Sequence, residues 1–334
     1  YGEIKSSDGA EENVIEKEKL KTQINFVGDV MLGRHVEYLM SQHGSDYPYR
    51  FIDFLDPENS YTVGNFEASI PINHVKTPNF NFNFSVNPWY LGELNKAGFT
   101  HLSLANNHAF DYGFEGFKNA KVQLERNNLL AFGQPNELST SSITFINLPK
   151  HRIAIIGIHS VFSLPNDKDM KMILEHAENN SDFQVAFIHW GEEYQHQQSK
   201  TQRQLATKFS ELGTDLIVGH HPHVVQGLEK INNTLVFYSL GNFIFDQYFS
   251  QDVRQGLTLR LFENSDSELS LDLIPVTSEE NLAQPAAMVG TEKNIFLNKL
   301  AQYSSDEIQE DIRLAKINLR NMLATSTETA IIAE

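Results

Sequence analysis

Short apolar segments that end in polar or metal-binding residues recur along the 334-residue chain and constrain its fold more than any other feature. Runs of this length and composition are typical of parallel strands that are buried on both faces. The carboxyl ends of parallel strands meet at one edge of a sheet, where ligands bind. We therefore expect the polar residues that close these segments to share one site. The segments are INFVGD (24–29), YTVGNFE (61–67), THLSLANNH (100–108), QVAFIHWG (184–191) and DLIVGHHPH (215–223).

The stretches between these strands indicate an α/β layered fold. Apolar residues at helical spacing, a capping Asn87 followed by Pro88, and glycines at the ends of segments predict helices. The alternation of strands and helices favours a substantially parallel core. The predicted helices cover 87–98, 113–128 and 199–213, and further strands cover 152–158, 234–240, 256–262 and 269–276, the last two pairing as a hairpin.

The chain is expected to divide into three regions. Residues 1–23 are polar and charged, which indicates a linker or tether. The folded domain is expected over 24–280. Residues 281–334 are expected to form a peripheral helical and polar extension, in which a polar loop leads into a helix over 306–324 and a frayed tail.

Charge and cysteine content argue against several classes of function. The formal net charge is −17, which disfavours nucleic acid as a partner because binding to its phosphates depends on Lys and Arg. The same charge argues against a polybasic membrane patch. The chain has no cysteine, which excludes disulfides, thiolate nucleophiles and Cys-ligated zinc.

Candidate ligands follow the first and third of these strands. Asp29 comes directly after Gly28, which lets the backbone turn tightly beside an ion, although a Gly-Asp pair also fits a plain turn. Asn107 and His108 lie in the loop LANNHAFDYG together with Asp111. An Asn oxygen can bind a metal and an adjacent His can protonate a leaving group, but the same residues also fit a capped loop.

Histidines close the two later strands. His189 ends an apolar strand, a position where a histidine is more often structural than a ligand. The sequence GHHPH is more specific, because His221 and His223 alternate around Pro222, which holds the run extended. Three histidines within four residues after a buried strand indicate a metal or phosphate site. Asp, Asn and His together suit Mn²⁺, Fe or Zn²⁺.

Six motifs in these segments resemble the CapA or PgsA family of poly-γ-glutamate capsule proteins. They are GDVMLGRHVE, VGNFEASI, LANNHAFDYGFEGF, HWGEEY, GHHPHVVQG and YSLGNFIFD, which occur in the family's order over roughly residues 24–250. The family is distantly similar to calcineurin-like metallophosphoesterases. The resemblance implies a metallophosphatase-like layered sandwich of two β-sheets flanked by helices.

The resemblance also implies a set of metal ligands, with two departures from the metallophosphoesterase pattern. Met31 stands where that pattern has a histidine, and Asn65 stands at or near its bridging aspartate, with Glu67 two residues further on. Residues two apart in a strand share one face, so Glu67 could supply the missing carboxylate. We therefore expect one strong and one weak site for a divalent metal (Mn, Fe or Zn). The implied ligands are Asp29, Asn65, Glu67, Asn107, His189, His221 and His223.

Other residues in the motifs are candidates for catalysis or substrate binding. His108, Arg34 and Asp111 are the candidate catalytic residues, and Arg34 also suits an anionic group through its bidentate fork. As single residues, Arg34 also fits an exposed helix start and Asn242 a backbone turn under the site. His220 is an alternative to His221 as a ligand. The candidate substrate-binding residues are Arg34, Glu193, His220 and Asn242.

The resemblance implies a role in synthesis or export of the capsule polymer, and two hypotheses on its chemistry remain. The first is a metal-dependent hydrolase or phosphoesterase. The second is a non-catalytic scaffold subunit of a membrane synthase, which binds the polymer and uses the metal site structurally. The implied partners are poly-γ-glutamate or a similar anionic polymer and the membrane synthase subunits. An extracytoplasmic location is expected, with a membrane anchor in a segment absent from this chain.

Overall fold

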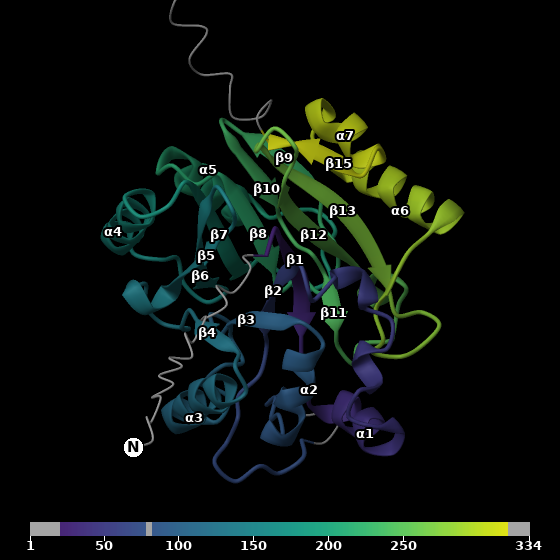
Figure 1. The fold of residues 1–334 in the computed structure, drawn as a ribbon. Helices are drawn as coiled ribbons and strands as arrows, with labels where there is room; N and C mark the ends of the chain where they lie inside the picture. The colour runs from purple at the N-terminus through teal and green to yellow at the C-terminus, as the bar shows by residue number, and fades with distance from the viewer. Residues whose placement is uncertain (1–20, 78–81, 320–334) are drawn as a thin grey trace, which may run out of the picture.

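Two β-sheets packed face to face form the centre of the molecule (Figure 1). The computed structural model describes residues 21–77 and 82–319. The first sheet has nine strands and the second has six. The first sheet runs β14 (Ala286–Ala287), β13 (Leu269–Thr277), β12 (Gln255–Glu263), β1 (Gln23–Val30), β2 (Ser60–Phe66), β3 (Phe99–Ser103) and β4 (Leu130–Phe132), with β11 (Asn242–Ile244) beside β1 and β15 (Lys316–Asn318) beside β13. The second runs β5 (Ile143–Asn147), β6 (Arg152–Ser160), β7 (Phe183–Trp190), β8 (Leu216–His220), β10 (Thr234–Phe237) and β9 (Leu228–Ile231).

Helices flank the sheets on their outer faces (Figure 1). Their apolar residues pack on the sheets and leave polar residues to solvent, as the helical period requires. The helices on the first sheet are α1 (Arg34–His43), α2 (Leu91–Lys96) and α3 (Gly113–Arg126). Those on the second sheet are α4 (Asp167–Glu178) and α5 (Lys200–Glu211). Unlike these helices, α6 (Gly290–Tyr303) and α7 (Gln309–Arg313), near β13 and β15, pack against the core between the sheets.

Alternation along the buried strands builds the layers. In β1, Phe26 belongs to the core between the sheets, whereas Val27 belongs to the core under α1, α2 and α3. In β7, Phe187 faces the first sheet and Ile188 faces the side of α4 and α5. Successive strand residues point to opposite faces, so a strand covered on both sides must be apolar throughout. The predicted layered sandwich of two sheets flanked by helices is confirmed.

The predicted helices and the hairpin match the structure closely. The strands β12 and β13 pair antiparallel, which confirms the hairpin. Helix α5 begins with a capping box between Ser199 and Gln202. The helix predicted over 87–98 is a 3₁₀ turn followed by α2, and the Asn87 side chain accepts a hydrogen bond from the Trp89 amide.

The prediction for the chain after residue 280 is wrong in two respects. The expected polar loop contains helix α6, and the helix expected over 306–324 ends at Arg313 and gives way to β15, which pairs with β13. Ala315 has φ of 56°, a left-handed conformation that an α-helix cannot contain. The segment is not peripheral either, since Phe296 and Ile317 are buried in the core between the sheets. Of the linker expected over residues 1–23, residues 1–20 lie outside the described residues, and Gln23 is the first residue of β1. Residues 320–334 of the tail also lie outside the described residues.

Gly28 provides a test of how β11 docks on β1. A Cβ on Gly28 would lie 2.0 Å from the carbonyl oxygen of Gly241, which accepts a hydrogen bond from the Asp29 amide. Gly28→Ala is expected to lower the free energy of unfolding by about 1–3 kcal/mol or more, measured by urea unfolding. Gly92→Ala is the control, because Gly92 lies in α2 with its nearest neighbour 3.4 Å away and should gain up to about 1 kcal/mol. Equal effects of the two changes would contradict the tight contact.

Candidate metal centre

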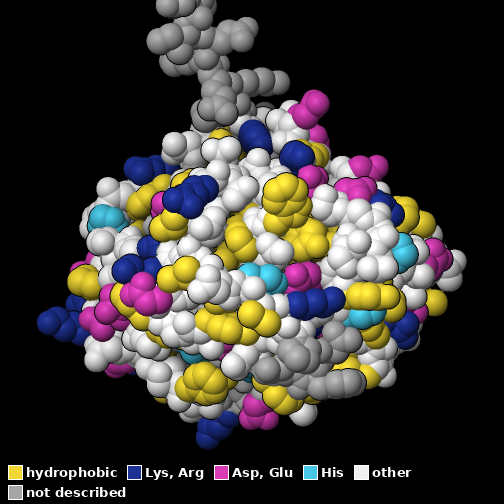
Figure 2. All heavy atoms as spheres, turned by 90° about the horizontal axis from the view of Figure 1, so that it is seen from below, with side chains coloured by type: hydrophobic (Ala, Val, Ile, Leu, Met, Phe, Trp, Pro, Cys, Tyr) yellow, Lys and Arg dark blue, Asp and Glu magenta, His cyan; other side chains and the backbone are white. Residues whose placement is uncertain are grey.

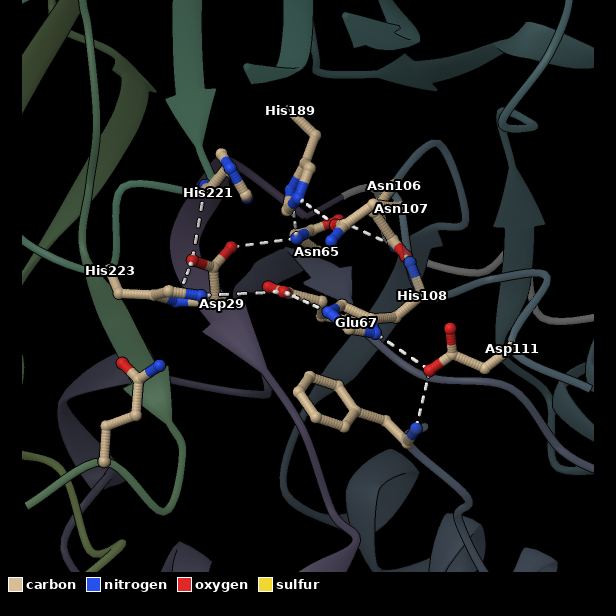
Figure 3. A network of polar contacts seen from close by, with 12 residues as sticks. Asp29, Asn65, Glu67, Asn106, Asn107, His108, Asp111, His189, His221 and His223 are labelled. Carbon is tan, nitrogen blue, oxygen red and sulfur yellow. Dashed lines mark hydrogen bonds and ion pairs between the residues drawn. The ribbon is translucent and has the colours of Figure 1, made fainter. Parts of the chain in front are cut away.

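The registers of the parallel strands bring the polar strand ends together. Asp29 on β1 lies beside Asn65 on β2, and His189 on β7 lies beside His220 on β8. The two sheets are joined at this end, because the Nε2 atom of His220 lies 3.1 Å from the carbonyl oxygen of Val27 on β1. Figure 3 shows the resulting cluster, and Figure 2 shows the face seen from below in Figure 1, where histidine, acidic and basic side chains gather near its middle.

Glu67, directly after β2, is the centre of this cluster (Figure 3). Its side chain is fully buried, and neither carboxylate oxygen has a hydrogen-bond partner among the described residues. Two histidine ring nitrogens lie near Oε1, His223 Nε2 at 3.7 Å and His108 Nε2 at 3.8 Å. Burial, followed by the charge of Asp29, raises the pKa of the Glu67 carboxyl well above its ordinary value. A buried carboxylate without donors is costly, and a bound cation would remove that cost.

His221 and His223 reach the cluster through an unusual backbone. Their φ angles are 98° and 58°, a region that non-glycine residues occupy at a cost of order 1–3 kcal/mol. Such strain is concentrated at functional sites. The Nδ1 atom of His221 is buried without a hydrogen-bond partner among the described residues. Burial, with a smaller contribution from the charge of His223, lowers the pKa of His221 to about 3, so this ring is neutral and can bind a metal.

His223 is oriented by two partners on its Nδ1 side. Nδ1 lies 2.9 Å from Asn242 Oδ1 and 3.2 Å from Asp29 Oδ2, which leaves Nε2 facing Glu67. This arrangement, with one nitrogen held by an oxygen and the other directed into the site, is typical of metal-binding histidines. Burial alone would lower the pKa of His223, but the charges of Glu67 and Asp29 raise it to about 9. Asn242 therefore holds His223, and its predicted contact with substrate stays a prediction.

The ligand atoms of the cluster have the spacing that a single ion requires. Two triplets of buried residues, Glu67–His221–His223 and Asp29–Glu67–His189, each have ligand atoms within 4.8 Å of one another. Bonds from Zn²⁺ to nitrogen or oxygen are about 2.0–2.2 Å long, so ligands of one ion lie at most about 4.4 Å apart. Small side-chain movements would bring either triplet onto an ion. The expectation of a divalent metal fits these residues, which do not identify the metal.

An amide network occupies part of the second triplet. The Asn65 amide nitrogen lies 2.8 Å from Asp29 Oδ1 and 3.0 Å from His189 Nδ1. Its oxygen accepts a hydrogen bond from Asn106, and His189 Nε2 lies 2.7 Å from Asn107 Oδ1. The hydrogens of Asn65 thus point where an ion held by Asp29 and His189 would lie. Burial lowers the pKa of His189 well below its ordinary value, so this ring is neutral.

His108 lies beside Glu67 and is held by Asp111. The Nδ1 atom of His108 is 2.8 Å from Asp111 Oδ2, which also accepts a hydrogen bond from the Phe84 amide. The ring of Phe84 stacks on the imidazole with centroids 3.8 Å apart. Asp111 therefore fixes the orientation of the ring and leaves Nε2 on the side of the metal ligands, as expected of a group that transfers a proton near them.

The remaining predicted residues lie in different settings. Arg34 is buried at the start of α1 and forms an ion pair with Asp246, so it is not an exposed helix-start residue. Glu193 is exposed on the loop after β7. His220 has no exposed surface, which corrects its prediction as a substrate-binding residue, because it joins the two sheets behind the site.

Two aromatic residues that the sequence patterns did not single out lie in the site. Phe84 packs between His108 and Arg34, whose guanidinium carbon is 4.4 Å from the ring centroid. Tyr194, with φ of 62°, lies 6.1 Å from His223 between ring centroids. No spacing rule marks either residue, because both come from irregular segments that only the tertiary fold brings to the strand ends.

Comparison with known proteins assigns the family. The family model described as "Bacterial capsule synthesis protein PGA_cap" matches residues 23–247. The chain belongs to this family. It is 30% identical over 297 residues to the PGA biosynthesis protein CapA of Bacillus subtilis (strain 168), which covers 84% of this chain and 78% of that protein. It is also 30% identical over 310 residues to the capsule biosynthesis protein CapA of Bacillus anthracis, covering 86% of this chain and 75% of that protein. The predicted resemblance to the CapA family of capsule proteins is confirmed.

The comparison with solved structures gives a more distant similarity. A hypothetical protein from Thermus thermophilus matches 81% of this chain and 99% of its own length, with a TM-score of 0.46 and 14% identity. Within residues 21–77 and 82–319, none of the PGA_cap protein's helices has both the length and the apolar character to cross a membrane.

The raised pKa of His223 predicts that metal binding releases protons. At neutral pH this ring is protonated, because its pKa is about 9, and Nε2 must lose its proton to bind an ion. The apparent affinity for Mn²⁺ is therefore expected to rise by about tenfold per pH unit for each proton released, and to level off above pH 9. Anaerobic calorimetric titration from pH 6.5 upward measures this slope. Affinity that does not change across this range would contradict the role of His223.

The amide network predicts that Asn65 limits the number of ions. Asn65→Asp replaces the hydrogens that point at Asp29 and His189 with a carboxylate oxygen. The wild-type chain is expected to hold one tightly bound ion, and the variant to hold two, measured by elemental analysis after exhaustive dialysis. Asn106→Asp is the control, because Asn106 contacts Asn65 but neither triplet, and should leave the metal content unchanged. Two tight ions in the wild type would show that Glu67 already bridges both positions.

Proposed function

We propose that this capsule synthesis protein is a divalent-metal-dependent hydrolase that acts on poly-γ-glutamate or a similar anionic polymer. Membership of the PGA_cap family and the printed names of its CapA relatives support the polymer. The observation that carries the chemistry is the buried Glu67 carboxylate, which faces two histidines and has no hydrogen-bond donor among the described residues. Such a group fits a metal ligand better than a structural side chain.

Glu67, His221 and His223 would hold the principal ion, with Asp29 and Asn242 orienting His223. A bound divalent ion lowers the pKa of water and polarises a carbonyl or phosphoryl oxygen. The neutral ring of His221 suits this task, because ligands must be deprotonated. The Nε2 atom of His223 is oriented toward the site but must first lose its proton. The degenerate second position, where Asn65 donates hydrogen bonds, favours one strong site over two.

His108 would deliver a proton to the leaving group. Asp111 accepts from Nδ1 and stabilises a protonated ring, while Nε2 lies within 3.8 Å of Glu67 Oε1. Phe84 covers the flat side of the imidazole and excludes water from it. A general acid held in this way contributes about 10²- to 10⁴-fold to the rate.

A chain of net charge −17 that binds a polyanion needs a local source of attraction. The bound cation would supply it. Arg34 contributes less than the sequence suggests, because its guanidinium already forms an ion pair with Asp246 and lies over Phe84. An extracytoplasmic location and association with membrane synthase subunits fit a capsule role, and they stay predictions.

The scaffold hypothesis also has a specific observation in its favour. Asn65, Asn106 and Asn107 form a hydrogen-bonded network through His189, which stabilises the strand ends without any chemistry. In that case the ion would hold the loop of His221 and His223 in its strained conformation, and the polymer would bind without being cleaved.

Two variants separate the hypotheses. His108→Ala removes the proposed acid but no member of either ligand triplet, so metal content and melting temperature should stay unchanged. Hydrolysis of a panel of γ-glutamyl and phosphoester substrates should fall by about 10²- to 10⁴-fold, and capsule complementation should be lost. His223→Ala is the comparison, because it removes a ligand and should lower metal content and stability under both hypotheses. A His108→Ala strain with a normal capsule would support the scaffold.

A further inference from the structure

His159 ends strand β6 beside the metal centre but belongs to neither ligand triplet. It lies opposite His189 in the register of β6 and β7, and the two ring centroids are 6.1 Å apart. The strand predicted from the sequence ended at residue 158, so this histidine was not among the candidate residues. Its position places an imidazole one strand further from the ion than His189.

The hydrogen bonds of His159 fix its tautomer. Nδ1 lies 2.8 Å from the carbonyl oxygen of Pro135, and because a carbonyl only accepts, Nδ1 must carry the hydrogen. In the neutral ring this leaves a lone pair at Nε2. Nε2 is buried, and the described residues supply no hydrogen-bond partner for it. A buried acceptor without a donor calls for a ligand that donates.

His159 also lines a cavity of about 190 Å³ at this edge of the second sheet. The polar lining is neutral or acidic. Gln134, Asn136, Asn166 and Ser163 supply amide and hydroxyl groups, and Glu137 and Asp169 supply carboxylates. Neither Lys nor Arg is among the described residues that line it. Such a cavity disfavours a carboxylate and favours an uncharged hydrogen-bond donor. Phe162, which is 79% exposed, packs edge-on against the imidazole and would have to turn aside for a ligand to reach the ring.

We propose that His159 Nε2 accepts a hydrogen bond from a backbone amide N–H of the polymer, one linkage away from the bond at the metal centre. This inference rests on the proposed function and adds a subsite to it. A γ-glutamyl chain carries one amide per unit, and its carboxylates would point away from the acidic cavity. His159 is thus a specificity-determining residue that selects chains long enough to have a second amide.

The test compares two substitutions on substrates of different length. His159→Asn can still donate to the Pro135 carbonyl but has no acceptor at the position of Nε2, whereas His159→Gln can place an amide oxygen there. With a γ-glutamyl pentamer, His159→Asn is expected to raise KM by about three- to tenfold with little change in kcat, the effect of one neutral hydrogen bond. His159→Gln should recover most of this loss. The γ-glutamyl dimer, which has only the scissile amide, should be unaffected.

A substrate with one atom changed completes a double-mutant cycle. A pentamer in which an ester replaces the second amide lacks the N–H donor. With the wild type, this ester should raise KM by the same factor as His159→Asn raises KM for the amide pentamer. His159→Asn should show no additional loss on the ester. His176→Asn, an exposed histidine on α4, is the control for a histidine far from the site. Equal losses on the dimer and the pentamer, or a further loss on the ester, would overturn the proposal.

Two outcomes separate an error in the proposed hydrolase activity from an error in the proposed subsite. If the wild type binds the pentamer without cleaving it, hydrolysis is wrong and the same comparisons are made on Kd by calorimetry. If the wild type neither binds nor cleaves γ-glutamyl oligomers, the ligand assigned to His159 is wrong.

Discussion

The burial of the Glu67 carboxylate among histidine rings is the interaction on which the rest of the site depends. Placing an ion of this kind away from water costs several kcal/mol unless other charges and donors compensate. The protein supplies no hydrogen-bond donor among the described residues and instead surrounds the carboxylate with ring nitrogens of His108 and His223. The strained backbone at His221 and His223 adds to the cost. A cation that binds only the folded state stabilises that state. A bound cation would therefore offset the cost of both features.

The arrangement of strands in the two sheets brings the residues of this cluster together, whatever reaction they take part in. Parallel strands of two sheets end at the same edge, and close backbone contacts at Gly28 and Gly219 let neighbouring segments approach. The candidate ligands therefore come from several strand ends, and a ring can be oriented by a residue of another segment, as Asn242 orients His223. Rigid strands place the side chains, and in the proposed function the loops that follow them would carry the groups that touch substrate.

The sequence predicted the parts of this arrangement that depend on local pattern. Apolar runs ending in Asp29, His189 and the GHHPH segment were enough to predict the strands and their shared edge, because burial and strand period are local properties. The ion pair between Arg34 and Asp246 joins residues 212 positions apart and has no local signature. The same holds for His220, whose burial follows from the packing of one sheet on the other. Strand β15 was mistaken for helix because the turn at Ala315 depends on a single backbone angle.

The order of strands in the first sheet has a consequence for when the site can form during synthesis. Strand β1, which carries Asp29, pairs with β12 along its first half and with β11 at its end, and both partners are made more than two-thirds of the way along the chain. Contacts so distant in sequence form slowly, because a long loop must close first. A nascent chain that has only its first half therefore lacks His189, His221 and His223, which complete the two triplets around Glu67. If the cluster holds the proposed ion, metal loading would then be a late event that follows assembly of the sheet.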